Sequence, residues 1–319
     1  MSRKTGSVVS ILTGIALALL IAGCSSLSPA ATRQPPPPPA ASSSGLASGP
    51  STGVQSTGID HVVIIVEENH SASGILGNSD APYINQLAAK NALATNYKAV
   101  AHPSLPNYLA LTSGTTAGIT DDCDPGGACT ANVPNITDAI VESGRTWKMY
   151  AESMPAPCTD RNSGTYGVRH NPFMYYPGVT NDQSSCRAHV VPLTQLSKDL
   201  KTASSLPDYS FISPNACNDM HDCSVATGDA WLSHQAEQIL ASPAFTTQKS
   251  LLVITWDEDD DNQDNTVATI FAGPAARQAY KSSTAYTHYS LLHTIESAWG
   301  LKPMTANDKN APIMSDMLK

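Results

Sequence analysis

The sequence has little positive charge. Its 319 residues include 18 lysines and arginines against 27 aspartates and glutamates, which gives a formal net charge of −9. A chain this acidic is a poor electrostatic partner for nucleic acid or for an anionic membrane surface. Charged residues of both signs make up only 14% of the chain, but 41% is hydrophobic, which is too much for a disordered protein. We therefore expect a folded chain of one large or two small domains, with no nucleic-acid partner.

The first apolar run is too short, and too closely followed by polar sequence, for a membrane span. It extends from Val8 to Ala22 behind two basic residues, as in a bacterial export signal. Its end, Leu20-Ile21-Ala22-Gly23-Cys24, resembles a lipoprotein signal-peptidase site. This resemblance implies a signal peptide of residues 1–23 and a lipid-modified Cys24; an ordinary secretory signal with a chance cysteine is the alternative. Several acyl chains would anchor the protein stably at the outer face of the envelope, because each buried methylene contributes roughly 0.8 kcal/mol.

Residues 24–58 lack any apolar periodicity that could build a core. Proline, serine, glycine and alanine fill most of this stretch, and Arg33 is its only charged residue. Pro35 to Pro39 should form a short, stiff polyproline segment with flexible sequence on both sides. We expect the stretch to be a tether that holds a folded domain, residues 59–319, away from the membrane.

No two cysteines have the C-x-x-C spacing that would support a structural zinc site. Six of the seven cysteines remain after Cys24, and an even number in an exported chain suggests disulfides, although six cysteines allow fifteen pairings. Pairing between neighbours is preferred because each pair then brackets one loop: Cys123 with Cys129, Cys158 with Cys186, and Cys217 with Cys223.

Residues 59–319 contain no internal repeat, and apolar strand-like runs alternate with helix-like segments. Strands are expected at 59–66, 146–150, 208–212, 251–256 and 267–272. Helices are expected at 82–92, 107–111, 136–141 and 228–240, with a last helix capped by Thr287. This alternation indicates a single α/β domain with a largely parallel central sheet flanked by helices.

Acidic and amide side chains follow three of the expected strands. Glu68 and Asn69 follow the first, Asp257 and Glu258 follow 251–256, and a segment with Asp219 and His221 follows 208–212. The carboxyl ends of parallel strands meet at one edge of a sheet, where ligands of such folds bind.

Glu68, Asn69, Asp257 and Glu258 supply oxygen ligands, which suit Ca²⁺, Mg²⁺ or Mn²⁺ better than Zn²⁺. Adjacent carboxylates cannot all be buried and ionised without a cation. An EF-hand is excluded because this acidic run lacks that loop's central glycine and terminal glutamate. A solvated acidic loop is the commoner fate of a charge run, and we expect it for three further residues, Asp260, Asp261 and Asp264.

A second segment, from His102 to Gly114, holds Ser104 between Pro103 and Pro106, just before a short helix. A helix N-terminus favours an anion, and a hydroxyl beside a cation and an anion site is the arrangement of a serine nucleophile. A proline-rich turn with an incidental serine explains this spacing equally well.

Five motifs occur in one order along the chain: Glu68-Asn69-His70-Ser71, His102-Pro103-Ser104-Leu105-Pro106-Asn107-Tyr108, Asn218-Asp219-Met220-His221-Asp222, Thr255-Trp256-Asp257-Glu258-Asp259-Asp260 and Thr287-His288-Tyr289-Ser290. Together they resemble the bacterial phosphoesterase family of acid phosphatases and phospholipases C, within the alkaline-phosphatase superfamily. The likeness is greatest to the short secreted acid phosphatases of mycobacteria, and it extends from about Ile59 to Pro312. It implies an alkaline-phosphatase-like fold.

The resemblance also implies roles for single residues. The implied metal ligands, for one or two ions, are Glu68, Asn69, Asp257, Glu258 and the nucleophile Ser104. Asn69, His102, His221 and His288 would hold the phosphate, and Asp219 would orient a histidine or bind a second ion. The other histidines outside these roles and motifs are expected to be surface or satisfied core residues: His61, His170, His189, His234 and His293. His70 and Cys223 depart from the family pattern, where arginine and glycine are usual.

These residues lead to the hypothesis of a metal-dependent acid phosphatase that hydrolyses phosphomonoesters through a phosphoserine intermediate. Protonated imidazoles in the phosphate clamp would give an acid pH optimum, because their reference pKa is about 6.5. A phospholipase C-type phosphodiesterase acting on phospholipid headgroups and a non-catalytic, cation- or ligand-binding surface lipoprotein are the alternatives. We expect a monomer that touches the membrane only through its lipid anchor.

Overall fold

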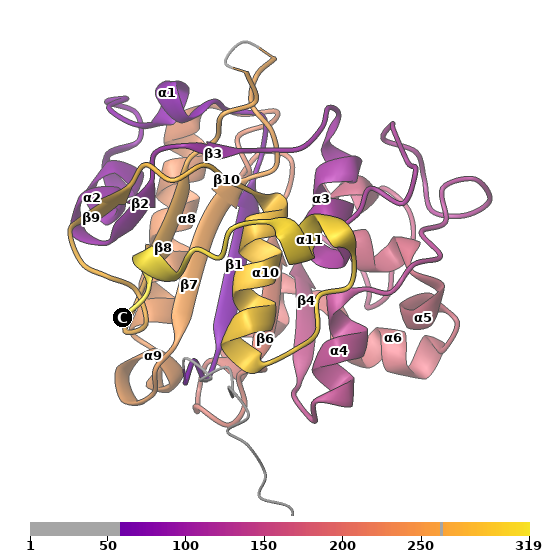
Figure 1. The fold of residues 1–319 in the computed structure, drawn as a ribbon. Coiled ribbons are helices and arrows are strands. Elements are labelled where there is room, and N and C mark those ends of the chain that lie inside the picture. The colour runs from indigo at the N-terminus through magenta and orange to yellow at the C-terminus, as the bar shows by residue number, and fades with distance from the viewer. Residues whose placement is uncertain (1–57, 262–263) are drawn as a thin grey trace, which may run out of the picture. The chain divides into compact units, whose positions relative to one another are not determined.

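An eight-stranded sheet runs through the part of the chain that the computed structural model describes, residues 58–261 and 264–319 (Figure 1). Its strand order is β5-β4-β6-β1-β7-β8-β2-β9. The strands are β1 Val62–Glu67, β2 Ala92–Ala94, β4 Trp147–Ala151, β5 Val190–Pro192, β6 Tyr209–Ser213, β7 Leu251–Trp256, β8 Thr269–Ala272 and β9 Tyr280–Ser282. A separate pair joins β3 (Tyr97–Lys98) to β10 (Tyr286–Thr287) in parallel.

The sheet is mostly parallel, as predicted. β1 lies between β6 and β7 and pairs with both in parallel, and β4 pairs in parallel with β5 and β6. β8 differs, because it pairs antiparallel with both β7 and β2. The described residues between β7 and β8 contain no crossover helix, and β8 returns beside β7 in the opposite direction.

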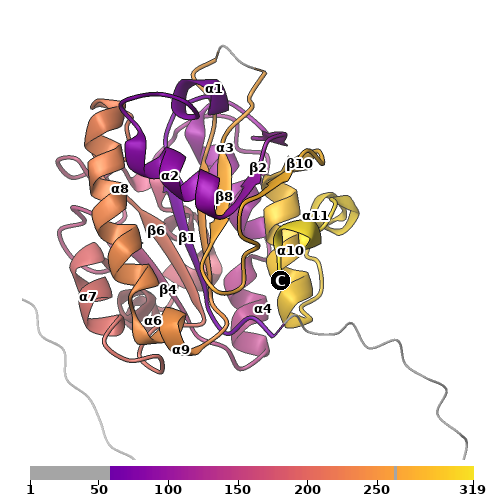
Figure 2. The same ribbon diagram turned by 90° about the vertical axis from the view of Figure 1, so that its left-hand side faces the viewer.

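Helices cover both faces of the sheet, which Figure 2 shows nearly edge-on. One face carries α2 (Pro82–Lys90), α8 (Val225–Leu240) and α9 (Pro243–Thr247). The other carries α3 (Ser104–Ser113), α4 (Ile136–Glu142) and α10 (His288–Trp299). The remaining helices are α1 Ala72–Ile75, α5 Pro177–Thr180, α6 Gln183–His189, α7 Leu196–Asp199 and α11 Ala306–Asn310, with 3₁₀ turns at Val168–His170, Pro172–Tyr175, Leu193–Gln195 and Ser315–Met317.

Local signals fix where the two long helices begin. Ser224 caps α8 by accepting a hydrogen bond from the Thr227 backbone nitrogen. Thr287 and Ser290 form a reciprocal capping box at the start of α10, as the expected cap at Thr287 required. The apolar sides of both helices are buried. The α/β architecture and the mostly parallel sheet predicted from the sequence are confirmed.

Three disulfides join the loops around the sheet, and they are the three pairs predicted from neighbouring cysteines. The Cα atoms are 6.1 Å apart in Cys123–Cys129, 5.6 Å in Cys158–Cys186 and 4.7 Å in Cys217–Cys223. The described residues include no helix long and apolar enough to cross a membrane. The predicted signal peptide, Cys24 and nearly all of the tether fall on residues 1–57, outside the described residues.

Candidate active site

Three neighbouring strands deliver the predicted residues to one edge of the sheet. Glu68 follows β1 directly and Asp257 follows β7, while Asp219 comes six residues after the end of β6. Backbone hydrogen bonds lock these segments together: the Glu68 nitrogen donates to the Asp219 carbonyl at 2.9 Å, and the Asn69 nitrogen donates to Asp257 Oδ1 at 3.2 Å. The three segments therefore meet at one edge of the sheet, as their positions after strands predicted.

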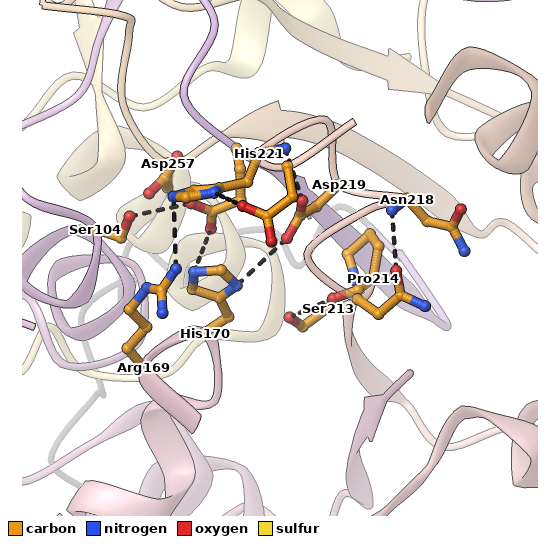
Figure 3. Close-up of polar contacts among 12 residues, drawn as sticks. Ser104, Arg169, His170, Ser213, Pro214, Asn218, Asp219, His221 and Asp257 are labelled. Carbon is orange, nitrogen blue, oxygen red and sulfur yellow. Dashed lines mark hydrogen bonds and ion pairs between the residues drawn. The ribbon is translucent and has the colours of Figure 1, made fainter. Parts of the chain in front are cut away.

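Ser104 is the first residue of α3, and it points into this cluster of acids (Figure 3). It is only 2% exposed. Its Oγ donates to Glu68 Oε2 at 3.0 Å and lies 3.4 Å from Glu258 Oε1. Asn107 fixes the segment that precedes α3, because its Oδ1 accepts hydrogen bonds from the backbone nitrogens of Val100 and Ala101, each at 3.0 Å.

Two further residues of α3 hold the acids in place. Tyr108 donates its hydroxyl hydrogen bond to Glu68 Oε1 at 2.5 Å, and Asn107 Nδ2 donates to Glu258 Oε2 at 3.2 Å. Ser104, Asn107 and Tyr108 lie at positions i, i+3 and i+4, so one helical face presents all three side chains to the site. The sequence motif contained Asn107 and Tyr108 but gave them no role.

Burial raises the pKa of every acid in the cluster. It raises the pKa of Asp257 to about 6 and, with help from the neighbouring charge of Asp257, that of Glu258 to about 9. Burial and then the charges of Asp257 and Asp219 raise the pKa of Glu68 well above its ordinary value. Burial and mutual repulsion therefore disfavour the ionised form of these carboxyl groups, and a bound cation would offset both effects.

Several oxygens in the cluster are buried without a hydrogen-bond partner among the described residues. They include Asn69 Oδ1, Asp257 Oδ2 and Asp219 Oδ2. Unpaired buried oxygens are costly, and oxygen-rich donor sets of this kind suit a hard divalent cation. The residues present therefore fit the metal expected from the sequence.

His170 belongs to the site, and the prediction that it is a surface or satisfied core residue is wrong. It is fully buried, with Nε2 3.4 Å from Glu68 Oε1 and Nδ1 3.4 Å from Asp219 Oδ2. Burial, followed by the charge of Arg169, lowers its pKa well below the ordinary value, so the ring is neutral. Glu68, His170 and Asp219 together could hold a metal ion.

Asp219 also connects that cluster to His221. Asp219 Oδ1 accepts a hydrogen bond from the His221 backbone nitrogen at 2.8 Å, and burial raises the pKa of Asp219 to about 7. The His221 ring is held between Asp222 Oδ1, 2.7 Å from Nδ1, and Arg169 Nη2, 3.5 Å from Nε2. Asp219 thus contacts the ring of His170 and the backbone of His221, and its expected role stays a prediction.

His102 lies on the opposite side, against the acidic loop that follows β7. Its Nδ1 is 3.0 Å from Glu258 Oε2, and its Nε2 is 3.3 Å from Asp259 Oδ1. About a third of the ring is exposed, so it can still reach a ligand. The three acids expected to be solvated, Asp260, Asp261 and Asp264, are exposed.

His288 differs from the phosphate-holding role expected for it. It is completely buried, its Nε2 lies 2.6 Å from the Asp257 carbonyl oxygen, and its Nδ1 lies 3.1 Å from the Tyr97 hydroxyl. Burial lowers its pKa to about 4, which keeps the ring neutral above that pH. Both ring nitrogens have protein partners, so in this structure His288 positions the backbone of Asp257.

Comparisons with known proteins identify the family of the chain. The model of the Phosphoesterase family matches residues 74–302. A relative from Mycobacterium tuberculosis, named phosphatidylinositol-3-phosphatase, is 40% identical over 81% of this chain and 82% of its own length. A phosphate-repressible acid phosphatase of Penicillium chrysogenum is 32% identical over 72% of this chain, which spans 57% of that relative.

Solved structures show the same fold at low sequence identity. A protein of the alkaline phosphatase superfamily from Vibrio parahaemolyticus has a TM-score of 0.59 at 12% identity, covering 82% of this chain and 72% of that one. Murine ectonucleotide pyrophosphatase/phosphodiesterase 5 has a TM-score of 0.56 at 9% identity, covering 81% of this chain and 100% of that one. These two likenesses concern the fold alone, whereas the family follows from the sequence matches: the chain belongs to the phosphoesterase family, and it is a hydrolase that acts on ester bonds.

Proposed function

We propose that this hydrolase is a metal-dependent acid phosphatase that cleaves phosphomonoesters through a phosphoserine intermediate at Ser104. One observation carries the proposal: the Ser104 hydroxyl, almost completely buried, touches Glu68 and Glu258 in a cluster of buried acids. Activated nucleophiles lie in such sites. The names of the mycobacterial and fungal relatives support phosphatase chemistry for the family.

Glu68, Asn69, Asp257, Glu258 and Ser104 would hold the cation. When bound, it supplies Lewis-acid stabilisation of the negative charge on the phosphoryl oxygens. His170 and Asp219 lie beside Glu68 and either fix its orientation or hold a second ion.

The chain's own residues account for the bond changes. Ser104 Oγ forms a bond to phosphorus while the bond to the ester oxygen breaks, and Glu68 Oε2 is placed to hold the Ser104 proton. The proton held by Glu68 passes to the departing ester oxygen, which leaves as the alcohol. Water then forms a bond to phosphorus while the bond to Ser104 Oγ breaks, and one proton of that water passes to Oγ, so that inorganic phosphate and free Ser104 result. His102 and His221 lie on the partly exposed rim and can hold phosphoryl oxygens. His288 contacts the backbone carbonyl of Asp257, and Tyr97 contacts His288, so these two residues position Asp257.

A Ser104→Ala variant tests this proposal. We expect it to lose nearly all turnover of a generic aryl phosphate, and the wild type to lose activity on chelation and regain it with one added divalent metal. Undiminished turnover by the variant would exclude the nucleophile. Turnover that resists complete metal removal would exclude the cofactor, and binding of metal without any turnover would favour the non-catalytic alternative.

The relatives bear on the choice of ester. The mycobacterial relative's name describes a phosphatase of a phosphoinositide, which is a phosphomonoester on a lipid headgroup, and this favours monoesters over the phospholipase C-type alternative. Comparing an aryl phosphate with a phosphocholine diester separates the two activities. Faster hydrolysis of the diester would reverse this choice.

We also propose that the enzyme is exported and anchored through a lipid on Cys24. The support is the sequence Leu20-Ile21-Ala22-Gly23-Cys24 alone. A Cys24→Ala variant should leave the membrane fraction while its catalytic domain stays active. Equal membrane retention of the variant and the wild type would contradict the anchor.

A further inference from the structure

The rim of the site contains a positively charged side chain, Arg169, to which the proposed mechanism gives no role. Arg169 precedes His170 in a 3₁₀ turn, and Figure 3 shows its guanidinium directed toward His221. Its side chain is 26% exposed, whereas His170 beside it is buried. Arg169 therefore lies between the buried acids and solvent.

The guanidinium is held loosely. Its Nε lies 3.4 Å from Asp122 Oδ2 and its Nη2 lies 3.5 Å from His221 Nε2. Strong charge-assisted contacts of this kind are 2.7–2.9 Å long. Its Nη1 has no hydrogen bond or ion pair with any described residue. A guanidinium has five donors in a fixed fork, so most of the capacity of Arg169 to bind an oxyanion is unused.

An anion of the chain already lies beside Arg169. The Asp122 carboxylate is 31% exposed, and while Oδ2 faces Arg169, Oδ1 accepts a hydrogen bond from the backbone nitrogen of Leu105 at 2.9 Å. Leu105 directly follows the nucleophile. The Asp122 carboxylate thus marks a position one residue from Ser104 at which a negative group is accommodated.

The charge of Arg169 reaches the centre of the site. It contributes to lowering the pKa of His170 and opposes the burial that raises the pKa of Asp219. The negative charge of Asp122 contributes to raising the pKa of Glu258. The pair is therefore electrically part of the site, although neither residue contacts Ser104.

We propose that Arg169 is a specificity residue that binds a second anionic group of the substrate, a carboxylate or a phosphodiester, and that Asp122 occupies this position until the substrate arrives. The inference rests on the proposed phosphomonoesterase function. It assigns the preferred substrates to phosphomonoesters that carry a second negative group on the leaving-group side. An arginine suits this task because its planar fork matches both carboxylate and phosphate oxygens.

Matched substrates test the proposal. Glycerol phosphates and the corresponding phosphoglycerates differ by one carboxylate, and inositol phosphate and glycerophosphoinositol phosphate differ by a phosphodiester with its glycerol. The wild type should prefer the doubly anionic member of at least one pair, and the pair that responds identifies the anion. Arg169→Gln should lower the preference for that member, measured as the ratio of kcat/KM for the two members of the pair, by about 10- to 100-fold, the range of a lost charged hydrogen bond.

Asp122→Asn is the second variant, because an asparagine oxygen can still accept the Leu105 hydrogen bond while the competing charge is gone. It should lower KM for the doubly anionic substrate. Equal losses on both members of a pair in Arg169→Gln, or no loss on either, would overturn the inference while leaving the phosphatase intact. A fall in thermal stability without a change in selectivity would reduce the pair to a structural contact and also overturn it. A wild type that hydrolyses none of these esters, nor an aryl phosphate, would overturn both the function and the inference.

Discussion

Removing one hydroxyl from α3 should weaken metal binding without touching a proposed ligand. Tyr108 donates to Glu68 Oε1 at 2.5 Å, and its ring stacks on His170 with the centroids 5.5 Å apart. Burial and the charge of Glu68 raise its pKa well above the ordinary value, so it stays a hydrogen-bond donor at every assay pH. Tyr108→Phe keeps the ring and leaves Glu68 with one orienting partner fewer.

The expected loss follows from the role of that hydrogen bond. Partners that orient a metal ligand typically contribute 10- to 100-fold in metal affinity. We therefore expect the metal concentration for half-maximal activity to rise by about 10- to 100-fold in Tyr108→Phe, with kcat at saturating metal within a few fold of the wild type. The assay is a metal titration of chelated protein with an aryl phosphate as substrate.

Tyr176→Phe is the matched control. Tyr176 is also buried and also contacts α3, but its hydroxyl meets Thr112 Oγ1 at 2.7 Å, away from the acids. The metal concentration that gives half-maximal activity in Tyr176→Phe should equal that of the wild type. A Tyr108→Phe variant that needs no more metal than the wild type, whether or not its kcat falls, would refute the assignment of Glu68 as a ligand held by Tyr108.

Two further predictions follow from buried groups. Burial and the charge of Asp308 raise the pKa of Glu296 from 4.5 to about 9. The side-chain oxygens of Glu296 have no hydrogen-bond partner among the described residues. The folded chain keeps this proton while the unfolded chain loses it, so the wild type should lose of the order of 1 kcal/mol of unfolding free energy per pH unit between these values. Glu296→Gln removes that penalty, and its melting temperature should gain on the wild type from about pH 5 to about pH 8; a constant difference would contradict an ionisable group at this position. His170→Phe keeps a ring against Tyr108 but loses both nitrogens, and kcat/KM should fall by about 10- to 100-fold; unchanged kinetics would remove His170 from the site.

The fold could be predicted where hydrophobic runs are long. β7 has the predicted bounds, Leu251–Trp256, and β1 ends at Glu67, one residue beyond its predicted range of 59–66. Both could be predicted because continuous apolar runs are typical of strands buried on both faces. β2, β5 and β9 were not predicted, since each has three residues and too few side chains to show a period. α3 was expected only at 107–111, yet it begins at Ser104. Pro106 in its first turn is tolerated, because the backbone N–H that proline lacks would have no hydrogen-bond partner within the helix at that position.

The site was predictable to the extent that strand ends and sequence motifs reveal it. Glu68, Asp257 and Asp219 each follow a strand of the central sheet, so topology alone brings them together. His170 comes from the long excursion between β4 and β5, and no strand end marks it. Tertiary packing alone places it between Glu68 and Asp219, and Arg169 reaches the rim through the same turn.

The central claim is that Ser104 carries the phosphoryl group during turnover. The most direct measurement is to quench the wild type with acid during hydrolysis of an aryl phosphate and to analyse the peptide containing Ser104 by mass spectrometry, with Ser104→Ala as control. The account predicts one added phosphoryl group on Ser104 of the wild type and none in the variant. Rapid turnover by the wild type with no phosphoryl group on Ser104 under any quench condition, together with an active Ser104→Ala variant, would contradict it.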